Sequence, residues 1–352
     1  MTTRLERTTA GEIVRTINEE RHKIGATATG MVLTLIIVTD EENQSDATRA
    51  ASFSAMEHPC RIITLIPRPG RVEPQLDANI DVGDTMGPGE TVRLRLRGDL
   101  AEHGASVALP LLLPDTPVVV WWPTACPDVP SEDPIGAMAQ RRITDAAASR
   151  HPMHALQQRK EGYLAGDTDL AWTRTTPWRA MLAAALDQPF APIIGVDVSA
   201  ERSNPSAALL QAWLQNALQV PVELHRSQGP GITSVVMHTK KGPIELTRPD
   251  GRTGRLTRPG VASHDVPLAR RDLRDLIGEE LRRLDPDDTY AEALANVELT
   301  STRRRGTAKK AASEGRAKPR ATKVAASDGK AKAPAKKTTA RRKPAPKAQA
   351  TP

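Results

Sequence analysis

The spacing of apolar residues predicts that the chain begins with an amphipathic helix. Residues 9–24 start with Thr9 and Glu12, the spacing of a helix capping box. The apolar side chains that follow recur at helical spacing and share one face: Ile13, Val14, Ile17 and Ile24. We therefore expect a helix whose apolar face is turned toward a core.

Two continuously apolar runs follow, GMVLTLIIVTD at 30–40 and CRIITLIP at 60–67. Unbroken β-branched runs are typical of strands that are buried on both faces of a sheet. Residues 42–57 between them are rich in Ala and polar on one side, which favours a helix. A strand, a helix and a strand of this length predict a parallel pair with a right-handed crossover.

Strict alternation of apolar and polar residues occurs in ETVRLRLRG at 90–98. It predicts a half-exposed strand with a basic row on its polar side, which we interpret as a solvated face: Arg93, Arg95 and Arg97. TPVVVWW at 116–122 predicts another buried strand. Helices are expected near 100–109 and at 134–139, 151–163 and 176–186. Together these elements predict an α/β domain over residues 1–188, with a buried, mostly parallel sheet.

The stretch from Pro189 to Pro192 marks a candidate domain boundary. After it we expect a strand at 193–199 and a helix that Ser203 caps, with Pro205 in its first turn. Short strands separated by Gly, Pro and Asp turns predict an antiparallel meander: 222–226, 232–239, 243–248 and 252–258. Helices at 267–284 and 287–298 would close it. The second prediction is therefore an α+β domain over residues 189–300.

Charge separates the last 52 residues from the rest of the chain. Residues 301–352 hold 17 Lys and Arg but 2 Asp and Glu, whereas the first 300 residues carry a net charge of −8. The tail also contains no Leu, Ile, Phe, Tyr, Trp or Met, so it is predicted to be disordered. Its charge alone predicts nonspecific, salt-sensitive contact with polyanions. The mildly acidic body argues against a nucleic-acid footprint there.

The two cysteines, Cys60 and Cys126, lie far apart and lack the spacing of a zinc site or a disulfide framework. This usage favours a reducing cytoplasm, with Cys60 at the buried entry of a strand. The N-terminus shows no apolar signal core, and the longest apolar runs fall short of the ~20 residues that span a bilayer. We expect a cytoplasmic protein with no membrane segment.

Motifs for cofactors and metals are weak. Gly83, Gly87 and Gly89 surround Pro88 and lead into a strand, so a turn is favoured over a dinucleotide fingerprint. His151 and His154 lack further ligands at useful spacing and are interpreted as surface or capping histidines. We therefore expect neither a cofactor nor a metal site.

The region most informative about function is Leu109–Asp187, which holds four of the five Trp residues. Its Trp, Arg and Asp residues are the candidate partner-binding residues: Trp121, Trp122, Arg141, Arg142, Asp145, Asp167, Asp169, Trp172, Arg174, Trp178 and Arg179. Trp and Arg are enriched at the energetic centres of interfaces. Two other interpretations are open: a buried network that orients residues 165–178 as a loop over the sheet, and an active site on Asp167 and Asp169. No tuned base or ligand set accompanies those carboxylates, so no catalytic residue is assigned.

The same region carries a family resemblance. LPLLLPDTPVVVWWP, RRITD and GDTDLAWTRTTPWR, together with VLTLIIVTD and EHPCRIITLI, resemble the glucose-6-phosphate dehydrogenase assembly protein (OpcA-like) family of actinobacteria and cyanobacteria. The resemblance spans roughly residues 10 to 300. It implies a non-catalytic partner that promotes the assembly and activity of the dehydrogenase that opens the oxidative pentose phosphate pathway.

The primary hypothesis is thus an assembly factor and allosteric activator that binds glucose-6-phosphate dehydrogenase. Replacing Trp172 or Arg174 with Ala is expected to abolish activation and leave the fold intact. One alternative is a sugar-phosphate-binding enzyme or sensor that uses Arg174 and Arg179. Another is a nucleic-acid-associated protein that acts through residues 301–352.

Overall fold

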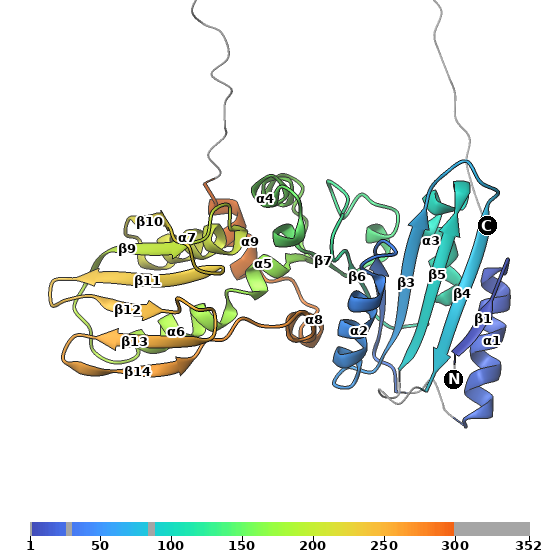
Figure 1. Ribbon diagram of the computed structural model, residues 1–352, viewed down its shortest axis with the longest axis horizontal. Helices are drawn as coiled ribbons and strands as arrows, with labels where there is room; N and C mark the ends of the chain where they lie inside the picture. Colours follow the sequence, from blue (N-terminus) through green and yellow to red (C-terminus); the bar gives the residue numbers. More distant parts are fainter. Residues whose placement is uncertain (1, 26–29, 84–88, 299–352) are drawn as a thin grey trace, which may run out of the picture. The chain divides into compact units, whose positions relative to one another are not determined.

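The computed structural model describes residues 2–25, 30–83 and 89–298, and its first half is built on an eight-stranded sheet (Figure 1). The strand order is β1-β4-β5-β3-β2-β6-β7-β8. The pairs β1–β4 and β4–β5 are antiparallel and the others are parallel. The strands are β1 (Thr2–Leu5), β2 (Leu33–Val38), β3 (Cys60–Arg68), β4 (Gln75–Val82), β5 (Glu90–Arg97), β6 (Val118–Trp121), β7 (Arg141–Thr144) and β8 (Asp167–Asp169). The predicted α/β class with a mostly parallel sheet is confirmed.

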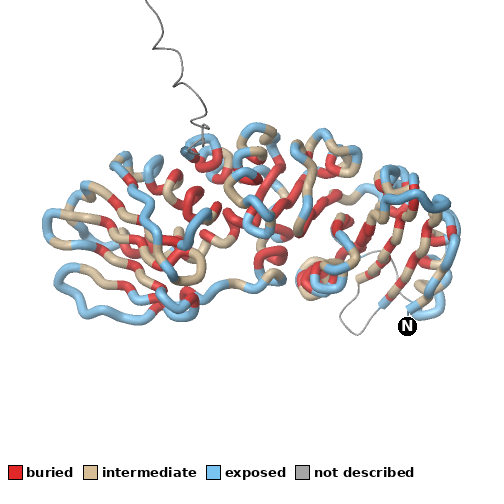
Figure 2. The backbone as a smooth tube through the Cα atoms, turned by 45° about the horizontal axis from the view of Figure 1, so that its top comes forward, coloured by how far each residue is buried: buried red, intermediate tan, exposed pale blue. Residues whose placement is uncertain are grey.

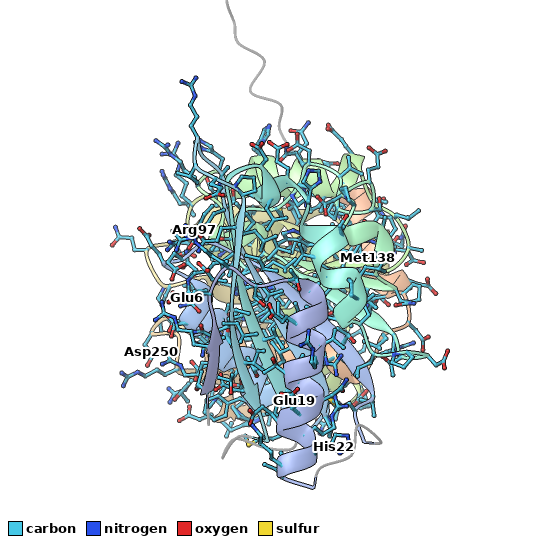
Figure 3. The ribbon with its side chains drawn as sticks, turned by 90° about the vertical axis from the view of Figure 1, so that its right-hand side faces the viewer. Glu6, Glu19, His22, Arg97, Met138 and Asp250 are labelled. Carbon is cyan, nitrogen blue, oxygen red and sulfur yellow. The ribbon has the colours of Figure 1, made fainter. Side chains whose placement is uncertain are left out.

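Helix α1 (Ala10–Lys23) begins where the sequence predicts, because the Thr9 hydroxyl accepts the Glu12 backbone N–H at 3.3 Å. The capping box does not close, since the Glu12 carboxylate accepts from the Thr8 hydroxyl instead. Ile13 and Ile17 are buried. Ile24 was wrongly placed on this face: it ends the helix and is 51% exposed. The outer face of α1 carries Glu19 and His22 (Figure 3).

The predicted strand–helix–strand unit is confirmed. Helix α2 (Gln44–Ala55) connects β2 to β3, which pair in parallel with Leu33 opposite Cys60. Side chains of the central strands alternate between the two faces of the sheet, so they pack in two separate hydrophobic cores. One core lies with α1 and the short helix α3 (Gly104–Ala108), and the other lies with α2 and α8 (Leu273–Arg282). Burying both faces explains why these strands are apolar throughout.

The arginines of the predicted basic row on β5 form ion pairs with carboxylates and do not face solvent only. Arg93 pairs with Asp81 at 3.1 Å, Arg95 with Glu41 at 2.8 Å, and Arg97 with Asp77 at 3.2 Å. Two of these carboxylates lie on β4, a strand that the sequence analysis missed. The interpretation as a simple solvated face was therefore incomplete, because cross-strand ion pairs neutralise the row.

Several predicted helices of the first half are shorter than expected. Residues 98–111 form two 3₁₀ turns around α3, and residues 136–138 form one 3₁₀ turn. Helices α4 (Pro152–Glu161) and α6 (Thr176–Leu186) match their predictions more closely. Residues 165–178, which one of the open interpretations treated as a loop, are not a loop. They contain β8 and the one-turn helix α5 (Leu170–Thr173), which the Asp169 carboxylate caps.

The second half contains a six-stranded sheet in the order β10-β9-β11-β12-β13-β14. Its elements are β9 (Ile193–Ala200), α7 (Pro205–Leu218), β10 (Val222–Arg226), β11 (Ile232–Thr239), β12 (Ile244–Thr247), β13 (Thr253–Arg258), β14 (Val261–Pro267) and α9 (Asp288–Asn296). Strands β11 to β14 form an antiparallel meander, and β11, β12 and β13 are three of the four strands predicted for it. Helices α6 and α7 bury one face of the sheet, so residues of strands such as β11 and β12 alternate between buried and partly exposed (Figure 2).

Three details of the second half differ from prediction. Strand β10 pairs in parallel with β9 and so lies outside the meander. The cap of α7 is Asn204, whose side chain accepts the Ala207 N–H at 2.9 Å, and Ser203 is not the cap. Residues 261–267, for which no strand was predicted, form the edge strand β14, and the helix expected from residue 267 begins at Leu273. Its exposed, polar sequence gives little strand signal.

Helix α8 belongs to the second half in sequence, yet its buried residues Leu276, Ile277 and Leu281 lie in a core of the first sheet. The division of the body at residue 188 stays a prediction. The predicted disorder of residues 301–352, and the part of the glycine motif at 84–88, lie outside the described residues. Within the described residues, no helix is long and apolar enough to cross a bilayer.

Candidate functional site

The eleven candidate residues lie on neighbouring elements: the parallel strands β6, β7 and β8 and the helices α5 and α6 that follow them. Nine of them are buried: Trp121, Trp122, Arg141, Arg142, Asp145, Asp167, Asp169, Trp172 and Trp178. Arg174 and Arg179 are the two with partial exposure. The structure thus places the predicted residues close together, but most of their side chains are buried in the interior.

Each of the four Trp side chains packs in a different core. Trp121 and Trp122, consecutive at the end of β6, lie in the cores on opposite faces of the first sheet. Trp178 packs against the second sheet. Trp172 lies between them with Tyr290 of α9, their ring centroids 5.9 Å apart. The Trp residues therefore connect the cores of the two sheets and do not form a common surface.

Arg142 and Asp167 form a buried pair that fixes the start of β8. The Arg142 guanidinium donates to the Asp167 carboxylate and, at 2.8 Å each, to the carbonyls of Ala139 and Ala165. The second Asp167 oxygen accepts the Leu164 N–H at 2.8 Å. A guanidinium held on three sides in this way locks two segments together.

Asp169 is fully buried and ties β8 to the end of β7. Its carboxylate accepts the Thr144 hydroxyl at 2.6 Å and the backbone N–H groups of Ala146 and Ala171 at 2.9 and 2.8 Å. Burial, followed by the nearby negative charge of Asp145, raises the pKa of Asp169 to about 6, although these hydrogen bonds oppose the shift. Asp169 is thus a capping and connecting residue.

Arg174 and Arg179 lie at the edge of the block. Arg174 donates both terminal nitrogens to Asp145 at 2.7 Å, and its side chain is 29% exposed. The Arg179 guanidinium lies 3.7 Å from the Trp172 ring centroid, a cation–π distance, and burial lowers its pKa. The two arginines therefore have different partners, Asp145 for Arg174 and the Trp172 ring for Arg179.

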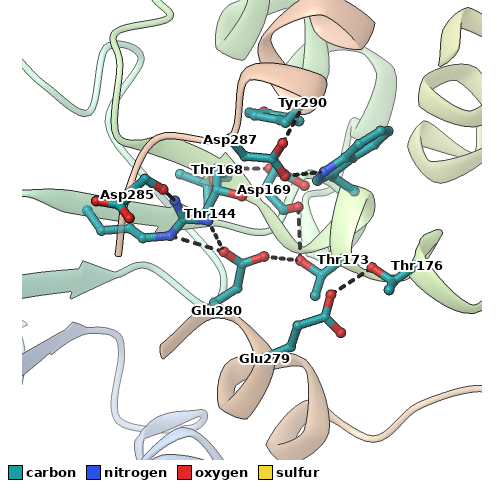
Figure 4. A network of polar contacts seen from close by, with 12 residues as sticks. Thr144, Thr168, Asp169, Thr173, Thr176, Glu279, Glu280, Asp285, Asp287 and Tyr290 are labelled. Atoms are coloured by element: carbon teal, nitrogen blue, oxygen red, sulfur yellow. Dashed lines mark hydrogen bonds and ion pairs between the residues drawn. The ribbon is translucent and has the colours of Figure 1, made fainter. Parts of the chain in front are cut away.

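Sequence reasoning missed the second half of this network, which α8 and the connection from α8 to α9 supply (Figure 4). The buried Glu280 accepts from Arg141 at 2.5 Å and from the Thr173 hydroxyl at 2.5 Å. Arg141 also donates to the Asp285 carbonyl at 2.8 Å, and Asp287 accepts the Trp172 indole N–H at 2.8 Å. One signal was available, because Glu280 follows Leu276 by four residues on the buried face of α8.

The geometry matches the interpretation as a buried structural network. Asp167 and Asp169, the pair considered for catalysis, are both engaged by interior donors. In this conformation the nine buried side chains have little surface to offer a partner. Partner binding by the candidate set stays a prediction, and the exposed edge formed by Arg174 and Arg179 is its accessible part.

Two further sets of reactive side chains lie outside the candidate residues, the Cys60 thiol and a cluster of metal-type ligands. Cys60 is buried at the start of β3, as predicted, and burial raises its thiol pKa to about 12. Among the described residues, one group of metal-type ligands occurs, formed by Asp197, Glu223 and His225 on the second sheet. Asp197 there also accepts from His238 at 2.7 Å, so hydrogen bonds account for the cluster.

Comparison with known families extends this picture. Residues 51–161 match the model of the N-terminal domain of the glucose-6-phosphate dehydrogenase subunit, and residues 165–294 match the model of its C-terminal domain. The two matches follow one another and cover most of the described residues. The chain therefore belongs to the OpcA family of glucose-6-phosphate dehydrogenase assembly proteins, and the resemblance stated from the sequence is confirmed.

Two relatives carry the provisional name OxPP cycle protein OpcA. The protein of Nostoc punctiforme is 27% identical over 60% of this chain and 52% of its own length. That of Synechocystis is 29% identical over 53% of this chain and 42% of its own length. The chain thus spans about half the length of these curated relatives.

Solved structures give only distant similarity. KijD10, a 3-ketoreductase from Actinomadura kijaniata, is 10% identical, with a TM-score of 0.43 over 76% of this chain and 95% of that chain. A dehydrogenase (MviM) from Clostridium difficile is 6% identical, with a TM-score of 0.40 over 74% and 95%. Neither similarity is close enough to inform the fold or the function.

The buried ion pair generates a stability prediction. Glu280→Ala leaves the Arg141 guanidinium buried and unpaired, so it should lower the free energy of unfolding by about 3–5 kcal/mol in urea titration. The neighbouring Glu279→Ala, which removes a partly exposed carboxylate, should cost about 1 kcal/mol or less. Adding Arg141→Met to Glu280→Ala should restore part of the loss. Equal effects of the two glutamate variants would show that Glu280 has no special role.

Asp169 generates a pH prediction. Its folded-state pKa lies above the ordinary value of 3.8, so its contribution to stability is present below about pH 4 and is lost as pH rises through 6. A carbon NMR titration of the Asp169 carboxyl in the folded protein should show a midpoint near 6. A midpoint below 4 would mean that its hydrogen bonds outweigh burial.

Proposed function

We propose that this chain is a non-catalytic assembly factor and allosteric activator that binds glucose-6-phosphate dehydrogenase in the cytoplasm. The observation that carries the proposal is the pair of consecutive family matches, both described as domains of a subunit of that dehydrogenase. The relatives named OxPP cycle protein OpcA agree with a role beside that enzyme.

The side-chain chemistry of the block supports a binding role over a catalytic one. Asp167 holds Arg142, and Asp169 holds Thr144 and two backbone N–H groups. A general acid or base has to reach a substrate within hydrogen-bond distance, but these carboxylates face the interior. Their role is to keep β7, β8 and α5 in fixed positions.

The proposed contact with the enzyme is the partly exposed edge of the block, residues 174–180, which run from the end of α5 into the first turn of α6. Arg174 and Arg179 reach the surface there, and each is preorganised by an interior partner, Asp145 or Trp172. An arginine already held in place loses little side-chain entropy on binding, which favours affinity. Partly exposed Arg beside buried Trp is the composition of an interface centre.

Activation then follows from differential binding. A partner that binds one state of the dehydrogenase more tightly shifts the population toward that state by the ratio of the two affinities. An active oligomer, or a state with higher substrate affinity, would be favoured in this way. A rigid contact surface suits this task, because a surface that adapts to both states would bind them equally.

The test is a titration of the glucose-6-phosphate dehydrogenase encoded in the same genome with the full chain. The rate should rise to saturation. Arg179→Ala should raise the half-saturating concentration about tenfold or more, because arginines at interface centres contribute strongly to binding. Arg15→Ala, which removes an exposed charge on α1, should leave the titration unchanged.

The Trp172→Ala variant is unsuitable for this test. Trp172 is buried in a core, so we now expect its replacement to lower the free energy of unfolding by about 3–5 kcal/mol and not to leave the fold undisturbed. No rise in rate, together with no co-elution of the two proteins, would contradict the proposed function. An equal effect of Arg179→Ala and Arg15→Ala would place the contact elsewhere.

A further inference from the structure

A pocket of about 230 Å³ lies at one end of the second sheet, where strands β9, β12 and β14 finish and β11 begins. The first turns of α6 and α7 also line it, through Pro177, Trp178 and Ser206. Pockets for small ligands commonly occur where several strand ends and helix starts converge. This pocket shares Arg174 and Trp178 with the candidate residues, but most of its remaining lining lies outside residues 109–187.

Arg248 is the most unusual residue of the pocket. It is 6% exposed, and it donates to the carbonyls of Leu268 at 2.8 Å and Ile232 at 3.0 Å. Its Nε is buried without a hydrogen-bond partner in the described part of the chain. Its guanidinium lies 5.0 Å from the Trp178 ring centroid. Burying a cation that has no carboxylate partner costs folding free energy, and buried cations are rarely found without a counter-charge.

A second cation without a carboxylate partner, Arg270, lies beside it. Among the described residues, no carboxylate lies within ion-pair distance of Arg248 or Arg270, whereas Arg174 pairs with Asp145 and Arg271 pairs with Glu279. Burial, and then the positive charge of Arg270, lower the pKa of Arg248 to about 10, while the negative charge of Asp250 opposes part of this shift. An anion between them would remove this repulsion.

The rest of the lining offers groups that bind hydroxyls. Glu201 and Asn204 lie on the loop before α7, where the Asn204 Nδ2 donates to Glu201 at 3.1 Å. Ser206 is in the first turn of α7, a 14-residue helix whose N-terminal dipole adds a partial positive charge. A lining that combines unpaired cations with hydroxyl-binding groups matches a molecule that carries a phosphate and hydroxyls.

We propose that this pocket binds a small phosphorylated metabolite, with Arg248 and Arg270 on the phosphate and Glu201, Asn204 and Ser206 toward its hydroxyl groups. Guanidinium groups fit phosphate oxygens through paired hydrogen bonds. The volume is below that of sites for drug-sized ligands and suits a ligand of the size of phosphate or a sugar phosphate. The proposal concerns the chain alone and does not depend on its binding to the dehydrogenase.

The test is isothermal titration calorimetry of the full chain, without dehydrogenase, using glucose 6-phosphate, glucose and inorganic phosphate. Saturable binding of a phosphorylated probe is expected, and none of glucose. If inorganic phosphate binds as tightly as glucose 6-phosphate, the pocket recognises the phosphate group alone. If glucose 6-phosphate binds more tightly than inorganic phosphate, the pocket also recognises the sugar.

Arg270→Gln is the diagnostic variant, because this side chain is exposed and its replacement should not disturb folding. It should weaken the binding of the phosphorylated probe about tenfold or more, since it removes a charge-assisted contact. Lys240→Gln removes an equal charge from the turn at the other end of β11 and should have no effect. Absence of saturable binding, or equal binding by wild type and Arg270→Gln, would overturn the proposal. The second result would place the anion elsewhere, for example on the basic residues 301–352.

Discussion

The interaction on which the described body most depends is the buried ion pair between Arg141 and Glu280. Arg141 begins β7 in the first sheet, and Glu280 lies on α8, more than a hundred residues later. The pair is nearly solvent-free, so it stabilises only because the Thr173 hydroxyl and the Asp285 carbonyl complete its hydrogen bonds. It fixes α8 on the first sheet, and α8 in turn closes the core around Trp121.

This constraint explains the dense Trp, Arg and Asp sequence of residues 109–187. The segment has to connect a sheet buried on both faces with a second sheet covered on one face by α6 and α7. Trp121, Trp172 and Trp178 each fill a different core along that path, and the Arg–Asp pairs hold the short strands β7 and β8, which are too short to be stable alone. The proposed contact with the enzyme lies at the edge of the block, and the proposed ligand site lies in the neighbouring pocket.

The sequence was most informative where one local pattern decides the structure. Unbroken apolar runs identified β2, β3 and β6, and strict alternation identified β5. Strands β1, β4, β7, β8 and β14 were missed, because they are polar or very short and are stabilised by their neighbours. For the site, the proximity of Asp145, Asp167 and Arg174 followed from the sequence. The sequence did not predict that most candidate side chains point into the interior. Trp and Arg are favoured both at interface centres and in buried networks, so their presence does not distinguish the two. Glu280 and Arg248 come from distant elements, so only the tertiary structure brings them to the block and to the pocket.

The central claim is that the interior of the block is structural and that its exposed edge faces the dehydrogenase. Hydrogen exchange of the full chain, measured with and without the dehydrogenase, tests this most directly. The account predicts that binding slows exchange across residues 174–180 and leaves β6 and β7 unchanged, because those strands are already protected. Slower exchange confined to the first hundred residues, or no change anywhere in the chain, would contradict it.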